Sequence, residues 1–283
     1  MPTVSVVIPA FNEEGGIARQ IHGLHEVLGT SGWRWELLVV DDGSTDATAA
    51  RAEACGVNVL RLGRNHGYGA ALRAGIDATE YDWVLIIDAD GTYPSAAVGD
   101  LFHEAGESAM VVGARVTAAT NSAVLRSSAK WVLRMYAGLL VSQRIPDLNS
   151  GMRLIRRSSI SPVRDLLPRG FSFTSTITLA LLASGQSVKF VPIDYLPRVG
   201  RSKIRPADFF RMFRQITRVM LHYDPLRVMS MWGLVLSVAA AVAWPAGPAA
   251  ALTAGAVFGL GALLAGLWLE RKGCFGRAPR PRT

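Results

Sequence analysis

The feature that most constrains the fold is an alternation of short β-branched segments with amphipathic segments over the first 113 residues. The β-branched runs predict strands at 4–8, 36–40, 57–60, 83–87 and 110–112. Helical patterns fill the gaps at 14–28, 46–55, 69–78 and 95–105. Successive βαβ units predict an α/β domain with a mostly parallel sheet and helices on both faces. Such sheets bind ligands beyond the carboxyl ends of their strands, so functional residues are expected directly after the strands.

A second constraint is a run of 42 residues without a charge, from Val228 to Leu269. About 20 helical residues cross a hydrocarbon core, so one straight span would be too long. The Pro- and Gly-rich stretch at 244–248 divides the run and predicts a transmembrane hairpin with helices at about 228–244 and 249–269. Basic residues flank both outer ends, which predicts a multi-pass protein of the cytoplasmic membrane with its α/β domain and both termini in the cytosol. A buried helical pair in a soluble protein is the alternative.

The positive charge is concentrated in the middle of the chain. The net charge is +8, and the segment from Arg115 to Arg227 contains nineteen Lys and Arg but only five Asp and no Glu. Within this part, residues 206–226 predict a juxtamembrane amphipathic helix in the membrane interface, or else a helix packed on the domain. Membrane lipid and a lipid phosphate explain the charge better than nucleic acid, because no nucleic-acid-binding module is recognised. The two cysteines predict neither a disulfide framework nor a zinc site.

The expected organisation has four parts. Residues 1–205 are expected to form the α/β domain, 206–226 the juxtamembrane helix, 227–270 the transmembrane hairpin and 271–283 a basic cytosolic tail. The Ala- and Gly-rich hairpin permits close helix packing and a homo-oligomer.

Acidic residues stand at the ends of two predicted strands. Asp41-Asp42 follows ELLVV, and Asp88-Ala89-Asp90 follows WVLII. Carboxylates at D-x-D spacing can hold a hard divalent cation, although short acidic segments are often only solvated turns or helix caps. The glycines of Gly67–Ala71 precede a helix and could let backbone N–H groups approach an anion, or mark only a tight turn.

Eight segments occur in an order that resembles polyprenyl-phosphate glycosyltransferases, the dolichol-phosphate-mannose-synthase-like branch of the inverting GT-A nucleotide-sugar transferases. The resemblance covers residues 3–210 and rests on VSVVIPAFNEE, VVDDGSTD, GYGAALRAG, IIDADGTYP, VVGAR, DLNSGMRL, GFSFTSTITLA and VPIDYLPRVGRSKI. It implies a Rossmann-like GT-A fold. It also implies transfer of a sugar from a UDP- or GDP-sugar to a polyprenyl phosphate, such as undecaprenyl phosphate, with release of the nucleoside diphosphate. Two-helix hairpins occur in some members.

The resemblance implies roles for several residues on the donor side. Asp88 and Asp90 would carry Mg²⁺ or Mn²⁺, and Thr92 stands where related enzymes have a Gln that completes the metal shell, which leaves the third ligand open. Asp41 has an alternative role as a helix cap. The expected nucleotide-sugar contacts are Pro9, Ala10, Glu13, Asp41, Asp42, Gly67, Asp88 and Ala89.

The acceptor phosphate needs cations, and Arg offers bidentate geometry. Asp147 is expected to position the phosphate or act as a base, or to be only a turn residue; Ser150, Gly151 and Arg153 belong to its block. The acceptor is already an anion, so a strong base is less necessary. The expected acceptor contacts are Arg115, Arg126, Lys130, Arg198, Ser202 and Lys203, and the expected catalytic residues are Asp90, Asp147 and Arg115.

Two other functions are weighed against this one. A processive polysaccharide synthase carries Q-x-x-R-W, whereas residues 215–219 read QITRV and lack the Trp. A catalytically lapsed membrane scaffold that retains nucleotide affinity would have lost its acidic clusters, and these are intact. The sugar and the base stay open, because Asp and Glu accept from the N–H donors of several bases.

Overall fold

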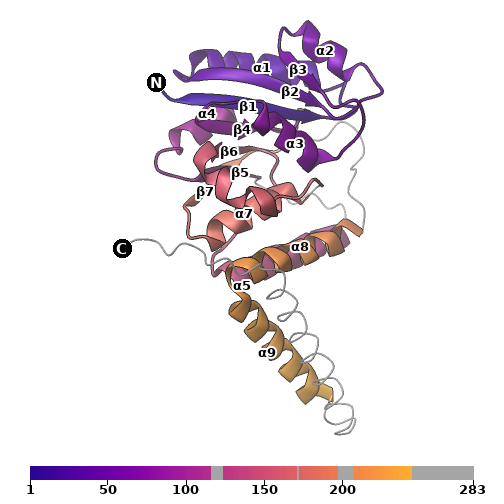
Figure 1. Ribbon diagram of the computed structural model, residues 1–283, viewed down its shortest axis with the longest axis vertical. Helices are drawn as coiled ribbons and strands as arrows, with labels where there is room; N and C mark the ends of the chain where they lie inside the picture. The colour runs from indigo at the N-terminus through magenta and orange to yellow at the C-terminus, as the bar shows by residue number, and fades with distance from the viewer. Residues whose placement is uncertain (116–123, 171, 197–206, 244–283) are drawn as a thin grey trace. The chain divides into compact units, whose positions relative to one another are not determined.

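The computed structural model describes residues 1–115, 124–170, 172–196 and 207–243. The chain divides into two compact units, 1–216 and 217–283, and each is described by itself. Within its described residues the first unit contains a seven-stranded sheet in the order β3-β2-β1-β4-β6-β5-β7 (Figure 1). The strands are β1 (Thr3–Ala10), β2 (Arg34–Asp41), β3 (Asn58–Arg61), β4 (Trp83–Ile86), β5 (Met110–Arg115), β6 (Arg153–Arg156) and β7 (Val188–Ile193).

The prediction of a mostly parallel α/β sheet is confirmed. β1 pairs in parallel with β2 and β4, β2 with β3, and β5 with β7. Each of the five strands expected from the sequence is present. β6, for which the sequence analysis gave no expectation, lies between β4 and β5 and is antiparallel to both. An antiparallel strand begins at the edge where its parallel neighbours end, so the residues before β6 reach the carboxyl-end edge of the sheet.

The four helices expected among these strands are also confirmed. They are α1 (Ile17–Thr30), α2 (Thr48–Ala54), α3 (Tyr68–Asp77) and α4 (Ala97–His103). In α1 the buried residues Ile17, Ile21, Leu24 and Leu28 recur at helical spacing and form one apolar face. This face packs with Val4, Val6 and Ile8 of β1 in the main buried cluster.

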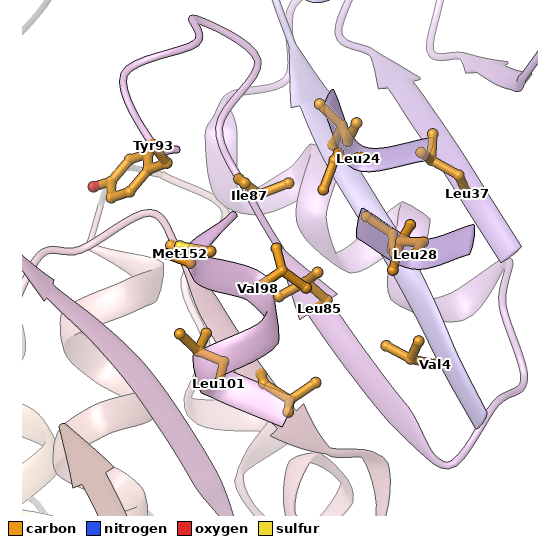
Figure 2. Close-up of a cluster of buried hydrophobic side chains, with 14 of the residues drawn as sticks. Val4, Leu24, Leu28, Leu37, Leu85, Ile87, Tyr93, Val98, Leu101 and Met152 are labelled. Atoms are coloured by element: carbon orange, nitrogen blue, oxygen red, sulfur yellow. The ribbon is translucent and has the colours of Figure 1, made fainter. Parts of the chain in front are cut away.

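Figure 2 shows this cluster, in which Leu24 and Leu28 lie over Val4 and Leu85, with Val98 and Leu101 of α4 beside them. Because side chains alternate along a strand, the remaining residues of β1 face the other side of the sheet, where α3 packs on β1 and β2. Helices therefore cover both faces. Each fully buried Leu or Ile contributes about 1.5–3 kcal/mol to folding, so this core fixes the strands whose ends carry the acidic residues.

Beyond β5 the first unit continues with α5 (Val124–Val141), α6 (Arg157–Ile160), the 3-10 helix η1 (Ser161–Leu166) and α7 (Phe173–Ala183). α7 is buried along nearly its whole length, including Thr174, Ser175, Thr176 and Thr178. α8 (Ala207–Tyr223) begins in this unit, and its Phe213 stacks on Tyr136 of α5 with ring centroids 4.7 Å apart.

A helix is present where the juxtamembrane helix was expected. In the part of α8 that belongs to the first unit, Met212 and Ile216 are buried, whereas the side chain of Phe210 is 73% exposed. Part of the apolar face therefore packs on the domain, as the alternative interpretation required, and part faces outward. Its contact with a membrane stays a prediction.

In the second unit, α9 (Pro225–Ala243) lies where the first transmembrane helix was expected at 228–244. Across the described stretches of the chain, no helix is both long and apolar enough to cross a membrane. The second expected span, 249–269, and the basic tail, 271–283, lie outside the described residues. The transmembrane hairpin stays a prediction.

Candidate active site

The acidic residues expected at one edge of the sheet are brought together there. The parallel register pairs Ala10 with Asp41 and Val7 with Ile86, so the ends of β1, β2 and β4 lie side by side. The N-cap residue of α1 approaches the same edge, since a Cβ added at Gly16 would lie 2.8 Å from the carbonyl oxygen of Ala89. Pro9 and Ala10 are buried at this edge, and Glu13 is half-buried with its N–H donating to Thr48 Oγ1 at 2.8 Å.

The Asp41-Asp42 pair shapes the loops around it. Asp41 Oδ1 accepts the N–H of Ser44 at 3.1 Å, so this residue closes a turn. It does not cap α2, whose N-cap is Ala47 and carries no side-chain cap bond. Both oxygens of Asp42 accept backbone N–H groups, from His66 at 2.7 Å and from Gly67 at 2.8 Å. Both aspartates are buried, and the Asp42 carboxylate holds the loop that leads into α3.

In the glycine loop before α3, the N–H groups of Gly67, Ala70 and Ala71 donate to acceptors within the protein. The N–H of Gly67 donates to Asp42, and that of Ala70 donates to the carbonyls of Gly67 and Arg169 at 2.9 and 2.8 Å. The N–H of Ala71 donates to the Gly67 carbonyl at 3.1 Å. These three N–H groups are therefore engaged within the protein, as in a tight turn. A nucleotide contact of Gly67 stays a prediction.

The second acidic pair follows β4, and a hydroxyl group donates to each of its carboxylates. Tyr68, at the start of α3, donates its phenol to Asp88 Oδ1 at 2.8 Å. Burial, and then the charge of Asp88, raises the pKa of Tyr68 well above its ordinary value, so the phenol stays protonated. Thr92 donates its hydroxyl to Asp90 Oδ1 at 2.6 Å and its N–H to the same oxygen at 3.1 Å. Asp90 and Thr92 are both buried.

The loop before β6 lies directly against Asp88. A Cβ added at Gly151 would lie 2.1 Å from Asp88 Oδ2, so only glycine leaves room for this carboxylate. The N–H of Gly151 donates to the phenol oxygen of Tyr93 at 2.7 Å. Burial, and then the nearby charge of Asp88, raises the pKa of Tyr93 above its ordinary value. Tyr93 thereby joins the turn after β4 to the loop before β6.

Arg115 and Asp147 form a bidentate ion pair beside these groups. Arg115 Nε lies 2.6 Å from Asp147 Oδ2, and its Nη2 lies 2.9 Å from Oδ1. Burial alone would raise the pKa of the Asp147 carboxyl, but the hydrogen bonds and charge of Arg115 hold it below its ordinary value. The guanidinium also lies 5.2 Å from the ring centroid of Tyr195, which packs edge-on against Tyr93. The paired Asp147 is therefore a weak base.

Arg153 is fully buried, and its side chain stabilises the loop before β6 by hydrogen bonds. Its guanidinium donates to the carbonyls of Ser150 and Leu148 at 2.8 and 2.9 Å and to Thr178 Oγ1 at 2.5 Å. Burial lowers the pKa of Arg153 to about 10, which leaves it charged at neutral pH. Ser150 adds a bond from its hydroxyl to the Gly113 carbonyl at 2.6 Å. The segment DLNSGMR (147–153) is thus held in place by hydrogen bonds from Arg153 and Ser150.

The remaining expected acceptor contacts are not placed by the structure. Arg198, Ser202 and Lys203 lie outside the described residues, as do the side chains of Arg126 and Lys130 in α5. Tyr68, Tyr93 and Tyr195 were not predicted from the sequence as site residues. All three lie within the family-like segments, but nothing in the spacing of those segments marks a tyrosine as a neighbour of an acidic residue.

The residues present fit a divalent cation bound in part by substrate. Within the described stretches, no cluster of three or more His, Cys, Asp or Glu side chains suited to a metal was found. Mg²⁺ is commonly bound by one or two carboxylates together with substrate phosphates and water, rather than by an all-protein cage. Asp88 and Asp90 would provide such a pair of hard oxygen ligands at the strand end.

The comparisons with known proteins agree with this fold. The chain matches the family description "Glycosyl transferase family 2" over residues 5–163. An undecaprenyl-phosphate 4-deoxy-4-formamido-L-arabinose transferase from Salmonella paratyphi B is 27% identical over 245 residues, which cover 83% of this chain and 72% of that protein.

Solved structures with similar folds include glucosyl-3-phosphoglycerate synthase from Mycobacterium tuberculosis in complex with Mn²⁺, UDP and phosphoglyceric acid. It has a TM-score of 0.61 and 24% identity, over 80% of this chain and 78% of that one. The same synthase with phosphoglyceric acid alone gives a TM-score of 0.58 and 26% identity, over 78% and 79%. The fold is thus that of a GT-A glycosyltransferase. Within that class, the chain belongs to glycosyl transferase family 2.

Proposed function

We propose that this glycosyltransferase moves a sugar from a UDP- or GDP-sugar to a polyprenyl phosphate, with inversion at the anomeric carbon. The observation that carries the proposal is the Asp88–Asp90 pair, held at the end of β4 beside the ends of β1 and β2. The proposal is supported by the Salmonella relative, which is named as an undecaprenyl-phosphate sugar transferase. It is also supported by the similarly folded synthase solved with Mn²⁺ and UDP.

On the donor side, Asp88 and Asp90 would hold Mg²⁺ or Mn²⁺. When bound, such a cation neutralises charge on a donor diphosphate. The edge formed by Pro9, Ala10 and the loop at Asp41 then takes the nucleotide, because it adjoins the acidic pair and lies where open α/β sheets bind ligands.

On the acceptor side, an oxygen of the polyprenyl phosphate attacks the anomeric carbon. A new C–O bond to that phosphate forms while the bond to the donor diphosphate breaks, and the nucleoside diphosphate leaves with the bonding electrons. Attack opposite the leaving group inverts the anomeric carbon. The acceptor is already an anion, so no proton needs to be removed, which agrees with the low basicity of the ion-paired Asp147.

Arg115 is the described cation best placed to orient a phosphate near this edge. It is held by Asp147 and by the ring of Tyr195, so its guanidinium has one fixed position. A preorganised cation of this kind stabilises anionic groups without reorganisation during the reaction. Arg126, Lys130, Arg198, Ser202 and Lys203 are proposed as further contacts to the acceptor phosphate.

We infer a site at the cytosolic face of the cytoplasmic membrane, because a polyprenyl phosphate is embedded in lipid. The uncharged run 228–269 and its basic flanks support this location. Within the second unit, Leu226 and Leu234 of α9 are 77% and 66% exposed, as lipid contact requires. In the first unit, Phe210 of α8 is likewise exposed.

The proposal is tested with the detergent-purified full chain, undecaprenyl phosphate and a panel of labelled UDP- and GDP-sugars with Mg²⁺ or Mn²⁺. A lipid-phosphate sugar is expected with one donor, and it should disappear with EDTA and in Asp90→Asn. Asp100→Asn is the matched control, because Asp100 is an exposed carboxylate on α4. It should retain full transfer.

Two other results would point elsewhere. Nucleotide binding without transfer to any polyprenyl phosphate would contradict the proposed reaction and favour a lapsed enzyme or another acceptor. A long polysaccharide product would favour a processive synthase.

A further inference from the structure

The two aspartates of the proposed metal site share one structural feature. Each has its Oδ1 engaged by the hydroxyl of a neighbouring side chain, Tyr68 for Asp88 and Thr92 for Asp90. The two hydroxyls come from different elements, one from the start of α3 and one from the turn after β4. Hydrogen bonds from hydroxyls to carboxylates are short and strong because the acceptor is charged.

Thr92 donates two hydrogen bonds to Asp90. Its hydroxyl and its N–H both donate to the same carboxylate oxygen, at 2.6 and 3.1 Å, and its side chain is 1% exposed. Thr92 stands where the resemblance places a metal-shell Gln. In this chain the side chain at that position contacts the aspartate, so its effect on a cation is exerted through Asp90.

Asp88 is held from two sides. The Tyr68 phenol donates to Oδ1, and the backbone of Gly151 closes on Oδ2, where a Cβ would lie 2.1 Å away. Together these contacts leave little freedom for the carboxylate to rotate. A ligand fixed within about 10–20° of its productive orientation binds a metal without first losing rotational freedom.

We propose that Tyr68 and Thr92 are positioning residues that fix the Asp88 and Asp90 carboxylates in the orientation that binds the divalent cation. This inference rests on the proposed function, in which the two aspartates hold Mg²⁺ or Mn²⁺. Both residues act on the metal through hydrogen bonds to its ligands. Loss of such outer contacts typically weakens metal binding by about 10- to 100-fold.

The test is a titration of the full detergent-purified chain with Mn²⁺, followed by the electron paramagnetic resonance signal of the unbound ion. UDP or GDP is present, whichever the wild-type protein binds. Tyr68→Phe and Thr92→Val remove only the hydroxyls, and each should raise the Mn²⁺ Kd by about 10-fold or more. Thr92→Ser keeps the hydroxyl and should restore binding to near the wild-type value.

Two controls separate positioning from general damage. Tyr81→Phe removes a phenol from the segment before β4, at the opposite end of that strand, and should leave the Mn²⁺ Kd unchanged. The nucleotide Kd measured in EDTA should change little in all the variants. A variant that also loses nucleotide binding would assign its residue a structural role, which overturns the inference for that residue.

The remaining outcomes distinguish this inference from the proposed function. An unchanged Mn²⁺ Kd in Tyr68→Phe and Thr92→Val, with binding abolished in Asp90→Asn, would overturn the positioning role and leave the metal site intact. Thr92→Ser binding as weakly as Thr92→Val would show that shape and not the hydroxyl matters, which also overturns it. Failure of the wild-type protein to bind Mn²⁺ would overturn the proposed metal site itself.

Discussion

Replacing Asp147 by Asn tests the ion pair that orders the acceptor side of the site. In the wild type, Asp147 accepts from Arg115 Nε, Nη2 and backbone N, and from the N–H of Asn149 at 3.0 Å. An Asn amide keeps one oxygen acceptor but turns its NH₂ group toward a second donor. The bidentate pairing is lost, and Arg115 keeps a charge without its counter-ion.

The expected cost follows from the burial of the pair. Breaking a fully buried ion pair costs about 3–5 kcal/mol. Here the Arg115 and Asp147 side chains are 23% and 11% exposed, so water screens part of the charge. We therefore expect a loss of about 2–3 kcal/mol in the free energy of unfolding, or about 5–10 °C in Tm for a unit of this size.

The assay is thermal unfolding of Asp147→Asn, Arg115→Met and the double variant in one detergent. The double variant should be more stable than the sum of the single effects predicts, by about 2 kcal/mol, because it leaves no unpaired charge. Glu53→Gln is the control, since its pair with Arg61 is about half exposed and worth about 0–1 kcal/mol. Additive single effects would refute the coupling argued here.

The effect of Asp147→Asn on Tm should depend on pH in a definite direction. The folded-state pKa of Asp147 is lowered, so its contribution to stability is complete above the ordinary carboxyl pKa and is lost as the pH falls through the lowered value. The Tm difference between the wild type and Asp147→Asn should be constant from about pH 5 to pH 8 and shrink below about pH 4. A difference that grows on acidification would contradict this sign.

Three further predictions concern other contacts. Gly151→Ala places a methyl group on Asp88, so transfer and Mn²⁺ affinity should each fall by about 10-fold or more while nucleotide binding in EDTA is retained; unchanged transfer would refute the close approach. Asp42→Asn removes one charge-assisted bond to the loop before α3, and thermal unfolding should show a loss of about 1.5–3 kcal/mol. Phe210→Ser should weaken binding of the protein to anionic lipid vesicles in flotation assays, whereas equal binding would show that this exposed ring does not contact lipid.

The sequence predicted the first half of the fold because its signals there are local. β1 to β5 and α1 to α4 follow from hydrophobic periodicity, and the rule that parallel strands bind ligands at their carboxyl ends places Asp42 and Asp88 at one edge. β6 has only four residues, RLIR, with a charge at each end, so it carries no clear alternation. Its antiparallel insertion depends on pairing with β4 and β5, which no local pattern reveals.

The same limit explains which site residues were recognised. The aspartates stand out because carboxylates directly after apolar strands are chemically informative. Tyr68 and Tyr93 contact the site through their phenol groups, at Asp88 and Gly151. Where each phenol group lies is set by packing between segments distant in the sequence. The ion pair of Arg115 with Asp147 likewise joins two residues whose separate roles were predicted but whose contact was not.

The antiparallel insertion of β6 also bears on the order in which the strands of the sheet can pair during folding. β1, β2 and β3 lie within the first 61 residues and can pair early, at a low cost in loop closure. The pairing of Trp83 with Arg156 spans 73 residues, and only then does Gly151 reach Asp88. Long-range pairing of this kind slows folding. We therefore expect the donor-side edge to form before Gly151 approaches Asp88, so that the acidic pair is enclosed late in folding.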